Sequence, residues 1–502
     1  MTGNTELASQ SPESRVLIVI TCKDKENYIT CRYFLYFCGM KKIFGSTSKE
    51  DEQQRQERFV LMTESPVRQL VIKMAVPTII SMLVIALYNI IDAFFVGHIS
   101  TEATAGVGVS FAYMTFINAI GFYFGHGSGN YISTALGAKK YNDAEKMAAT
   151  GFLSSMGIGA IAAIVGLFFL SPLSRMMGAT PDILPYSNDY LLFVLIGTPF
   201  MMSSLTLNNQ LRLQGNARYA MVGLTTGAIL NILLDALFIY VLDMGVKGAS
   251  LATCISQMTG WFILLMGTEM NGNVHIRLRS FTPKLRSYVD IFNGGAPSLM
   301  RHVFVCVSTI MLNRYAAYYA APGTEASAIA AFAIVSRIMM FAFSIILGLG
   351  QGFQPVCGFN HGAGLHQRVR KSFTFTTILA TIILIITSIA FAIFAPDIIK
   401  IFRSEDAELV KIGTRVLRWQ CLSFPLIGVS TVTNMMYQTT RKTLVATVLS
   451  MGRQGIFFIP TIMILPLFIG FQGVEMTQAI ADALTFLLAL PFAIRESKCR
   501  GK

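Results

Sequence analysis

The sequence predicts an all-α membrane protein, with twelve transmembrane helices in two six-helix lobes related by pseudo-two-fold symmetry along the membrane normal. Three observations lead to this prediction. The chain of 502 residues is 53% hydrophobic and only 13% charged, with a mean hydropathy of +0.56, which is too apolar for a water-soluble protein of this length. Apolar stretches of the roughly 20 residues that cross a bilayer follow one another from Pro66 onward. An internal repeat divides these stretches into two halves.

The distribution of hydrophobic residues predicts twelve spans. They lie at about residues 70–97, 103–125, 146–170, 186–206, 218–241, 246–267, 288–314, 326–350, 373–395, 411–434, 444–467 and 472–494. With a cytoplasmic amino terminus, the inner loops and the carboxyl tail hold 18 Lys and Arg. The outer loops hold four clear ones, or eight when four near helix ends are added. Because positive residues accumulate on the cytoplasmic side, both termini are predicted to be cytoplasmic.

The repeat relates the two halves at an offset of 225 residues. Residues 125–140 align with 350–365, and residues 245–255 align with 470–480, with several glycines in register. Each half holds an even number of spans, so both halves insert in the same sense and are related by an axis along the membrane normal. Parallel repeats of this kind are typical of alternating-access transporters, in which the substrate lies between the lobes.

The same pattern divides the chain into five segments. We expect a disordered cytoplasmic extension at 1–63, the first lobe at 64–270, a cytoplasmic linker at 271–287, the second lobe at 288–495 and a cytoplasmic tail at 496–502. Apolar stretches before residue 40 are too short to span a membrane, and no signal peptide is recognisable. We therefore expect the native start at Met40 or Met62, with residues 1–39 not translated in vivo.

Composition and motifs exclude several other classes. The net charge of +13 lies in alternate loops and not in a basic, aromatic-rich block, so no nucleic-acid partner is expected. The eight cysteines lack metal spacing, and four of them lie in or beside apolar spans, so we interpret them as reduced thiols. The sequence contains no P-loop, HExxH motif or nucleophile elbow. We expect neither an enzyme nor a cofactor.

Ionisable residues inside the spans are the candidates for a functional site, because burying a charge in a bilayer is costly. Asp92 lies near the end of the first span and Asp235 in the fifth. Gly223, Gly227, Asn231 and Asp235 recur every four residues and so share one helix face, and the next span offers Thr253 and Gln257. Two carboxylates, an amide and a hydroxyl suit a hard cation, and two neighbouring carboxylates equally suit a proton. The alternative is that Asp92 lies at the membrane interface and Asp235 is merely paired.

The repeat favours a site in the first lobe. At the 225-residue offset Asn231, Asp235 and Thr253 align with Ile456, Pro460 and Gln478, so the oxygen set occurs in one half only. A structural need common to both lobes should be met in both. The other charges within spans are Arg301, Arg337, Arg453 and Asp482, which we interpret mainly as structural pairs or caps.

Four stretches of the chain resemble the multidrug and toxic compound extrusion (MATE) family, and its bacterial MepA-type efflux branch in particular. They are PTIISMLVIALYNIIDAFFVGHIS, ALGAKK, NILLDALFIYVLDMGVKGASLAT and RQGIFFIP, and the similarity covers roughly residues 64–495. The resemblance implies a two-lobed bundle that exports organic cations in exchange for H⁺ or Na⁺. It favours H⁺ slightly, because MepA-type relatives are proton-linked.

The resemblance also implies roles for individual residues. The first-lobe cation site would consist of Asp92, Asn231, Asp235 and Thr253, and the same four residues would bind the metal ion if the coupling ion is Na⁺. Tyr88 matches a tyrosine beside that site and Pro77 the bend of the first helix; with Gln257 they form the expected substrate-binding or gating set.

The implied partners are small organic cations and the lipid bilayer, and we expect a monomer in the plasma membrane. A lipid-linked precursor flippase of related architecture remains the alternative. It would need a more cationic central cavity for phosphate, for which Arg301 and Arg337 are the candidates.

Overall fold

The computed structural model describes residues 48–97, 99–271, 274–402 and 406–498. In these ranges every regular element is a helix, as the sequence predicts. The predicted start at Met40 and the tail beyond residue 498 lie outside the described residues.

The first lobe consists of six long helices and one short one. They are α3 (Val67–Gly97), α4 (Thr101–Gly137), α5 (Tyr141–Phe168), α6 (Leu170–Met176), α7 (Leu184–Leu213), α8 (Ala217–Ala236), which continues as the π-helical turn η3 (Leu237–Val241), and α9 (Gly245–Asn271). Because the connections are short, successive helices run antiparallel, and α7 packs against α4, α5 and α9.

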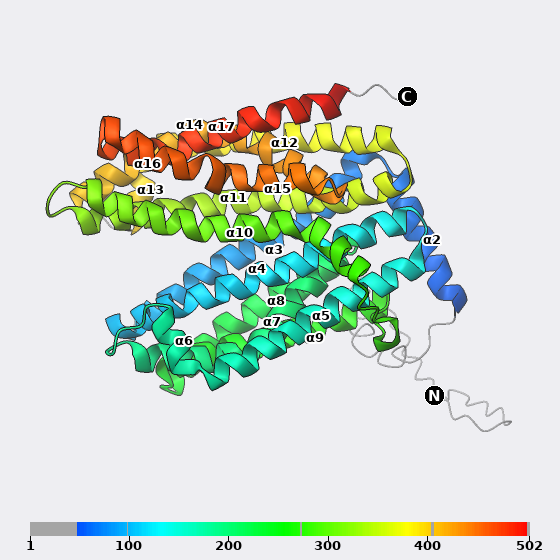
Figure 1. Cartoon of the computed structure of the whole chain (residues 1–502), viewed down its shortest axis with the longest axis horizontal. Coiled ribbons are helices and arrows are strands. Elements are labelled where there is room, and N and C mark those ends of the chain that lie inside the picture. The colour runs from blue at the N-terminus through cyan, green and yellow to red at the C-terminus, as the bar shows by residue number, and fades with distance from the viewer. Residues whose placement is uncertain (1–47, 98, 272–273, 403–405, 499–502) are drawn as a thin grey trace, which may run out of the picture. The chain divides into compact units, whose positions relative to one another are not determined.

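The second lobe repeats this order after the short 3₁₀ turn η4 (Leu278–Ser280). It contains α10 (Leu285–Tyr319), α11 (Glu325–Gly362), α12 (His366–Ile393), α13 (Ala395–Phe402), α14 (Ala407–Thr439), α15 (Thr443–Met451), the π-helical turn η5 (Gly452–Ile456), α16 (Phe458–Ile469) and α17 (Phe471–Lys498). In Figure 1 the green-to-red helices α10 to α17 form one group and the blue-to-green helices α3 to α9 the other.

Two local details support the predicted repeat. The short helix α13 follows α12 just as α6 follows α5. In the first lobe, Asn208 Nδ2 donates to the carbonyl oxygen of Ala220 at 2.8 Å, and in the second, Asn434 Nδ2 donates to that of Ala446 at 2.6 Å. The same hydrogen bond thus recurs between corresponding helices of the second lobe, at an offset of 226 residues, one more than the offset of the sequence repeat.

Eleven helices of the described chain are long and apolar enough to cross a membrane. The predicted span at 411–434 corresponds to α14, which has 33 residues but is too polar to be among the eleven. Its polar residues Gln420, Ser423 and Asn434 are buried. Helices α11, α12, α15 and α17 pack around α14. Protein groups, and not lipid, therefore surround much of its polar surface, and α14 takes the twelfth place in the two-lobe arrangement.

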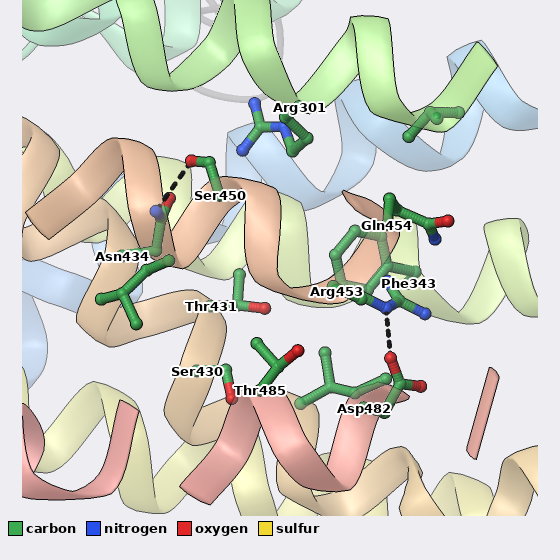
Figure 2. Close-up of a pocket in the computed structure, with 13 residues that line it drawn as sticks. Arg301, Phe343, Ser430, Thr431, Asn434, Ser450, Arg453, Gln454, Asp482 and Thr485 are labelled. Carbon is green, nitrogen blue, oxygen red and sulfur yellow. Dashed lines mark hydrogen bonds and ion pairs between the residues drawn. The ribbon is translucent and has the colours of Figure 1, made fainter. Parts of the chain in front are cut away.

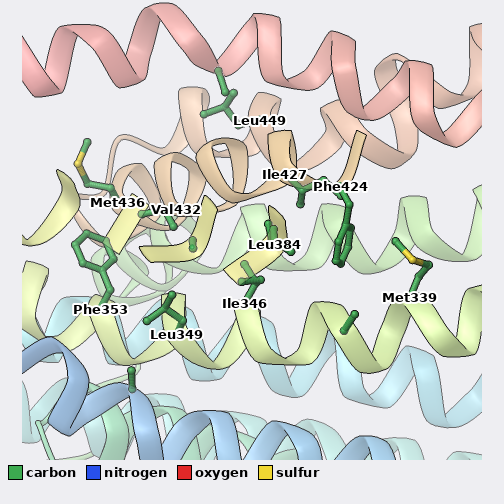
Figure 3. Packing of buried hydrophobic residues seen from close by; sticks show 14 of the residues in the cluster. Met339, Ile346, Leu349, Phe353, Leu384, Phe424, Ile427, Val432, Met436 and Leu449 are labelled. Atoms are coloured by element: carbon green, nitrogen blue, oxygen red, sulfur yellow. The ribbon is translucent and has the colours of Figure 1, made fainter. Parts of the chain in front are cut away.

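The core of the second lobe lies where α11, α12 and α14 meet. Figure 3 shows Ile346, Leu349 and Phe353 of α11 packed close to Leu384 of α12 and Phe424 of α14, all of them buried. The buried cysteines Cys254, Cys357 and Cys421 and the exposed Cys306 are free thiols, which confirms the prediction for these four.

The segment before the first lobe differs from the sequence-based expectation. Residues 1–63 were expected to be disordered, whereas Ser48–Glu64 form the helix α2. Arg55 forms an ion pair with Glu145 of α5 at 2.6 Å, and the Met62 carbonyl accepts a hydrogen bond from Asn360 of α11 at 3.1 Å. Met62 itself is fully buried. Helix α2 is ordered because it contacts both lobes, a tertiary effect that its own polar composition does not indicate.

The two lobes meet through α3 and α4 of the first and α10 and α11 of the second. The Thr78 hydroxyl donates to the Gly348 carbonyl at 2.8 Å, and the side chains of His126 and Ser298 hydrogen-bond at 3.1 Å. These contacts lie in the first half of α3 and α10 and the second half of α4 and α11. The lobes are therefore closed at the end of the bundle that carries α2.

Glycines of the repeat make this closure possible. A Cβ atom on Gly137 of α4 would overlap the Phe359 backbone of α11, and one on Gly352 of α11 would overlap the Ala75 backbone of α3. Only glycine permits backbones to approach so closely. Glycines within residues 125–140 and 350–365 thus belong to the contact surface between the lobes.

Candidate functional site

The acidic group of the first lobe is built on α3, α8 and α9. As predicted, Gly223 and Gly227 allow close helix packing: a Cβ on Gly227 would lie 3.2 Å from the Ser256 carbonyl oxygen of α9. Because α9 lies against this glycine-rich part of α8, the same helix face carries Asn231 and Asp235 toward Thr253. The sequence periodicity therefore selected the correct face.

Asn231 connects Asp235 to Thr253. In the amide orientation that satisfies both ends, Asn231 Nδ2 donates to Asp235 Oδ2 at 3.1 Å, and its carbonyl oxygen accepts from the Thr253 hydroxyl at 3.3 Å. Asp235 has no exposed surface, and its Oδ1 atom has no hydrogen-bond partner within the described chain. One carboxylate oxygen at the centre of the group is thus open to a proton or an ion.

Asp92 of α3 belongs to the same group. Its Oδ1 atom is also buried without a partner among the described residues, and its charge acts on Asp235. Tyr88, one helical turn earlier, lies within electrostatic range of both carboxylates and interacts with Thr253. Four of the residues predicted for cation coupling, together with Tyr88, therefore lie close together.

Two predicted residues lie apart from this group. Gln257 is half-buried on α9, and no hydrogen bond among the described residues joins it to the carboxylates. Pro77 is buried at the contact between the lobes, next to Thr78, which bonds Gly348. It lies 15 residues before Asp92, roughly 22 Å along the helix axis, so a role for Pro77 at the acidic group would have to be indirect.

Tyr190 is a member of the group that sequence reasoning missed. It lies on α7, is 1% exposed, and interacts with Thr253 and with the charges of Asp92 and Asp235. Its hydroxyl also contacts the Met114 sulfur atom at 3.7 Å. No local pattern marks Tyr190, because tyrosines are common in apolar helices and only the packing of α7 brings this one to the site.

The second lobe contains a cavity of about 90 Å³ with a different chemistry (Figure 2). Arg453, on η5, forms an ion pair with Asp482 at 2.7 Å, and Gln478 and Ser423 also donate to that carboxylate. Arg453 and Asp482 are therefore paired, as the structural interpretation expects. The π-helical turn at 452–456 directs Arg453 and Gln454 into the cavity, a use that π-turns often have at functional sites.

The other two arginines differ from each other. Arg301 lines the cavity from α10, whereas Arg337 on α11 is exposed and does not line it. Among the described residues no cluster of three or more His, Cys, Asp or Glu could hold a metal ion. The chemistry of the molecule is thus divided, with two open carboxylates in the first lobe and an arginine-lined cavity in the second.

Two repeated lobes of membrane-spanning helices, joined at one end and carrying buried charged groups, define the class of a two-lobed membrane transporter. The chain belongs to the MatE family, whose model matches residues 77–237 and 297–464. The two matched segments fall in the two lobes, in agreement with the internal repeat.

Relatives and solved structures agree with this assignment. Multidrug export protein MepA of Staphylococcus haemolyticus (strain JCSC1435) is 26% identical over 438 residues, covering 87% of this chain and 95% of its own. MepA of Staphylococcus aureus (strain MSSA476) is 25% identical with the same coverage. The outward-facing structure of a multidrug resistance MATE family transporter is 26% identical, with a TM-score of 0.81 over 87% of this chain and 97% of its own. A transporter from Pyrococcus furiosus, described as having a binding pocket of reversed polarity, is 25% identical. Its TM-score is 0.81, and the match covers 88% of this chain and 99% of its own.

Proposed function

We propose that this chain is a secondary active multidrug efflux transporter that exports organic cations by antiport against H⁺. The observation that supports this most directly is the pair of buried carboxylates Asp92 and Asp235, each with an oxygen that no described residue satisfies. The names of the MepA relatives support multidrug export.

The position of the acidic group suits exchange by alternating access. Asp92 lies five residues before the end of α3, and Asp235 lies just before the last residue of α8. Both are therefore in the half of the first lobe away from the closed, α2-bearing end. In this state the ion would reach the acidic group from the end of the bundle opposite α2. Movement of the lobes would then close that end and open the end that carries α2.

Competition between the ion and the drug would then couple the two fluxes. An organic cation and a proton both favour the ionised carboxylates, so protonation from outside would release the drug and deprotonation on the cytoplasmic side would reset the site. Two carboxylates in a low-dielectric interior cannot both remain ionised cheaply, which makes one of them a suitable proton carrier.

We favour H⁺ over Na⁺ because two neighbouring carboxylates in a low-dielectric interior suit a proton. Asn231 contacts the Thr253 hydroxyl at 3.3 Å in either orientation of its amide group. One orientation presents the NH₂ group to Asp235, and the other presents the carbonyl oxygen. The amide therefore accommodates either ion, and the choice of H⁺ rests on the two carboxylates.

Reconstituted protein tests the proposal. Liposomes containing purified transporter and a fluorescent organic cation are given either a pH gradient or a Na⁺ gradient. We expect drug movement to follow the pH gradient. Movement that follows a Na⁺ gradient at constant pH and membrane potential would contradict H⁺ coupling, and absence of movement under both gradients would contradict drug antiport.

Localisation and assembly follow from the same proposal. We infer a multi-pass plasma-membrane protein with cytoplasmic termini, active as a monomer, because the acidic group and the cavity are each built within one chain. Size measurement in detergent would test the monomer.

A lipid-linked precursor flippase is the second candidate function. It is favoured by Arg301, a cation that lines the second-lobe cavity. Accumulation of lipid-linked precursors after gene deletion, with unchanged drug sensitivity, would support the flippase. Drug hypersensitivity without precursor accumulation would support efflux.

A further inference from the structure

We propose that helix α2 is a latch between the lobes. The second lobe caps the carboxyl-terminal end of α2 only while the lobes are closed there, and loss of this cap favours opening. The inference rests on the alternating access of the proposed function and adds a device that sets its balance. It follows from two sets of contacts, because the side chains of α2 bind the first lobe whereas carbonyl groups at its end bind the second.

The side chains of α2 hold it against the first lobe. Arg55 forms an ion pair with Glu145 of α5 at 2.6 Å, and its guanidinium carbon lies 5.2 Å from the centroid of the Tyr141 ring. Phe59 faces Lys139, whose ammonium nitrogen lies 4.6 Å from the centroid of the Phe59 ring. Only two residues separate α2 from α3. Helix α2 is therefore attached to the first lobe by both its sequence and its contacts.

The carboxyl-terminal end of α2 is held by the second lobe. The Met62 carbonyl accepts a hydrogen bond from Asn360 Nδ2 of α11 at 3.1 Å. The carbonyl of Ser65, the residue after α2, accepts one from Arg368 Nη2 of α12 at 2.6 Å. Arg368 Nε also donates to Asn360 Oδ1 at 2.8 Å, so the two donors support each other. The charge of Glu64, the last residue of α2, acts on Arg368 as well.

These hydrogen bonds replace donors that the helix cannot supply. The last four carbonyl groups of an α-helix have no partner within it, and Pro66, which follows closely, has no N–H group to offer. The carboxyl end of a helix also carries a partial negative charge, which a guanidinium stabilises. Residues 52–57 of α2 are mostly exposed, and most helical stability in proteins comes from tertiary packing. The order of the last turn of α2 therefore depends on the cap.

The cap exists only while the lobes are in contact at this end. Asn360 and Arg368 belong to the second lobe, so separation of the lobes withdraws both donors from α2. The Met62 side chain stays with the first lobe: it is fully buried, and a Cβ on Gly215, in the turn between α7 and α8, would lie 3.3 Å from its sulfur atom. A contact made in one state and lost in the other stabilises only the first. Closure of the lobes and capping of α2 are therefore coupled, and weakening one weakens the other.

The capping pair is specific to the second lobe. At the 225-residue offset Asn360 and Arg368 align with Ala135 and Asp143 of the first lobe, which offer neither an amide nor a cation. A feature needed for the fold of each lobe would occur in both. The pair is thus suited to a contact that the chain makes once, between α2 and the second lobe.

Spin labels on the two lobes report the opening of this end. In a cysteine-free background, Lys140→Cys of the first lobe and Arg495→Cys of the second carry the labels, because both positions are exposed. Double electron–electron resonance measures the distance between the labels in full-length protein in liposomes, and mass spectrometry measures hydrogen exchange of the α2 backbone. The test variant is Arg368→Met, which keeps the length of the side chain and removes its donors. The control is Lys371→Met, at an exposed position of the same helix.

We expect Arg368→Met to raise the ratio of open to closed molecules by about tenfold, the effect of losing one hydrogen bond to a charged group. It should also speed hydrogen exchange in the last turn of α2, and Lys371→Met should change neither quantity. If Arg368→Met does not fold, the ion pair provides a second test. Arg55→Glu should detach α2 from the first lobe and shift the distances in the same direction, and adding Glu145→Arg should restore part of the closed population.

Equal distance distributions for Arg368→Met and Lys371→Met would overturn the latch. A shift of the distances without faster exchange in α2 would overturn it as well, and so would a charge swap between Arg55 and Glu145 that restores nothing. A different result would count against the proposed function itself: wild-type protein whose label distance stays constant at every pH, with and without the organic cation ethidium, would contradict alternating access.

Discussion

Buried carboxylates in this protein have different surroundings, and these should determine what each does. Asp235 has one oxygen held by Asn231 and one without a described partner. Asp482 is held by Arg453, Gln478 and Ser423. An open carboxylate can exchange a proton or cation, whereas one engaged on all sides is part of the structure.

Asp235→Asn should therefore abolish coupled efflux without preventing folding. The substitution keeps the shape of the side chain and removes the titratable charge, and a neutral amide is less costly to bury than a carboxylate. Asp92→Asn should impair efflux similarly or in part. Transport rates in liposomes at matched protein amounts test this, and a wild-type rate for well-folded Asp235→Asn would refute the coupling role.

Asp482→Asn should act on stability more than on coupling. The change leaves the Arg453 guanidinium without its carboxylate, and breaking one partner of a buried ion pair costs about 3–5 kcal/mol. Thermal unfolding in detergent should show a clear decrease in Tm, and Arg453→Gln in the same chain should restore part of it. An unchanged Tm together with a loss of efflux equal to that of Asp235→Asn would contradict the structural role.

Among the elements, α3, α4, α10 and α11 control the contact between the lobes. Their glycines sit where another backbone passes, and α2 contacts both lobes at the same end. Ring contacts add to the closure, since Phe122 of α4 stacks on His302 of α10 with centroids 5.1 Å apart. If access alternates, these contacts must separate and form again in each transport cycle.

Gly352→Leu should prevent closure at this end and abolish efflux, because its side chain would meet the Ala75 backbone of α3. The matched control is Gly157→Leu on α5, where a Cβ atom meets nothing within 4 Å. Efflux by both variants, normalised to folded protein, tests the prediction. Equal activity of the two would show that the close contact between α3 and α11 is dispensable.

At the scale of the whole molecule, the closed end is the end that carries the turn η4 and the start of α10. The sequence predicts this end to be cytoplasmic, because the positive residues of the inner loops lie there. The state described would then be closed toward the cytoplasm, with the acidic group in the opposite half of its lobe.

Cysteine labelling tests this orientation. In a cysteine-free background, Lys284→Cys should react with a membrane-impermeant thiol reagent only after the membrane is opened, whereas Lys247→Cys at the start of α9 should react in intact cells. Labelling of position 284 from outside would reverse the predicted topology.

The sequence by itself determined the helical architecture. Span length, the alternation of charged loops and the glycine repeat depend on composition and local spacing, and these are sufficient to predict two six-helix halves. The i, i+4 spacing of Asn231 and Asp235 likewise fixed the face of α8 that carries the acidic group, because a helix places such residues one above the other.

Only the tertiary structure decided which helices meet these faces. It brought Tyr190 of α7 to the acidic group and left Gln257 and Pro77 apart from it. It ordered α2, which the sequence suggested to be disordered, and it buried the polar side chains of α14 inside the second lobe. It also paired Arg453 with Asp482. Periodicity specifies the direction of a side chain from its own helix, whereas its partners depend on packing between segments distant in sequence.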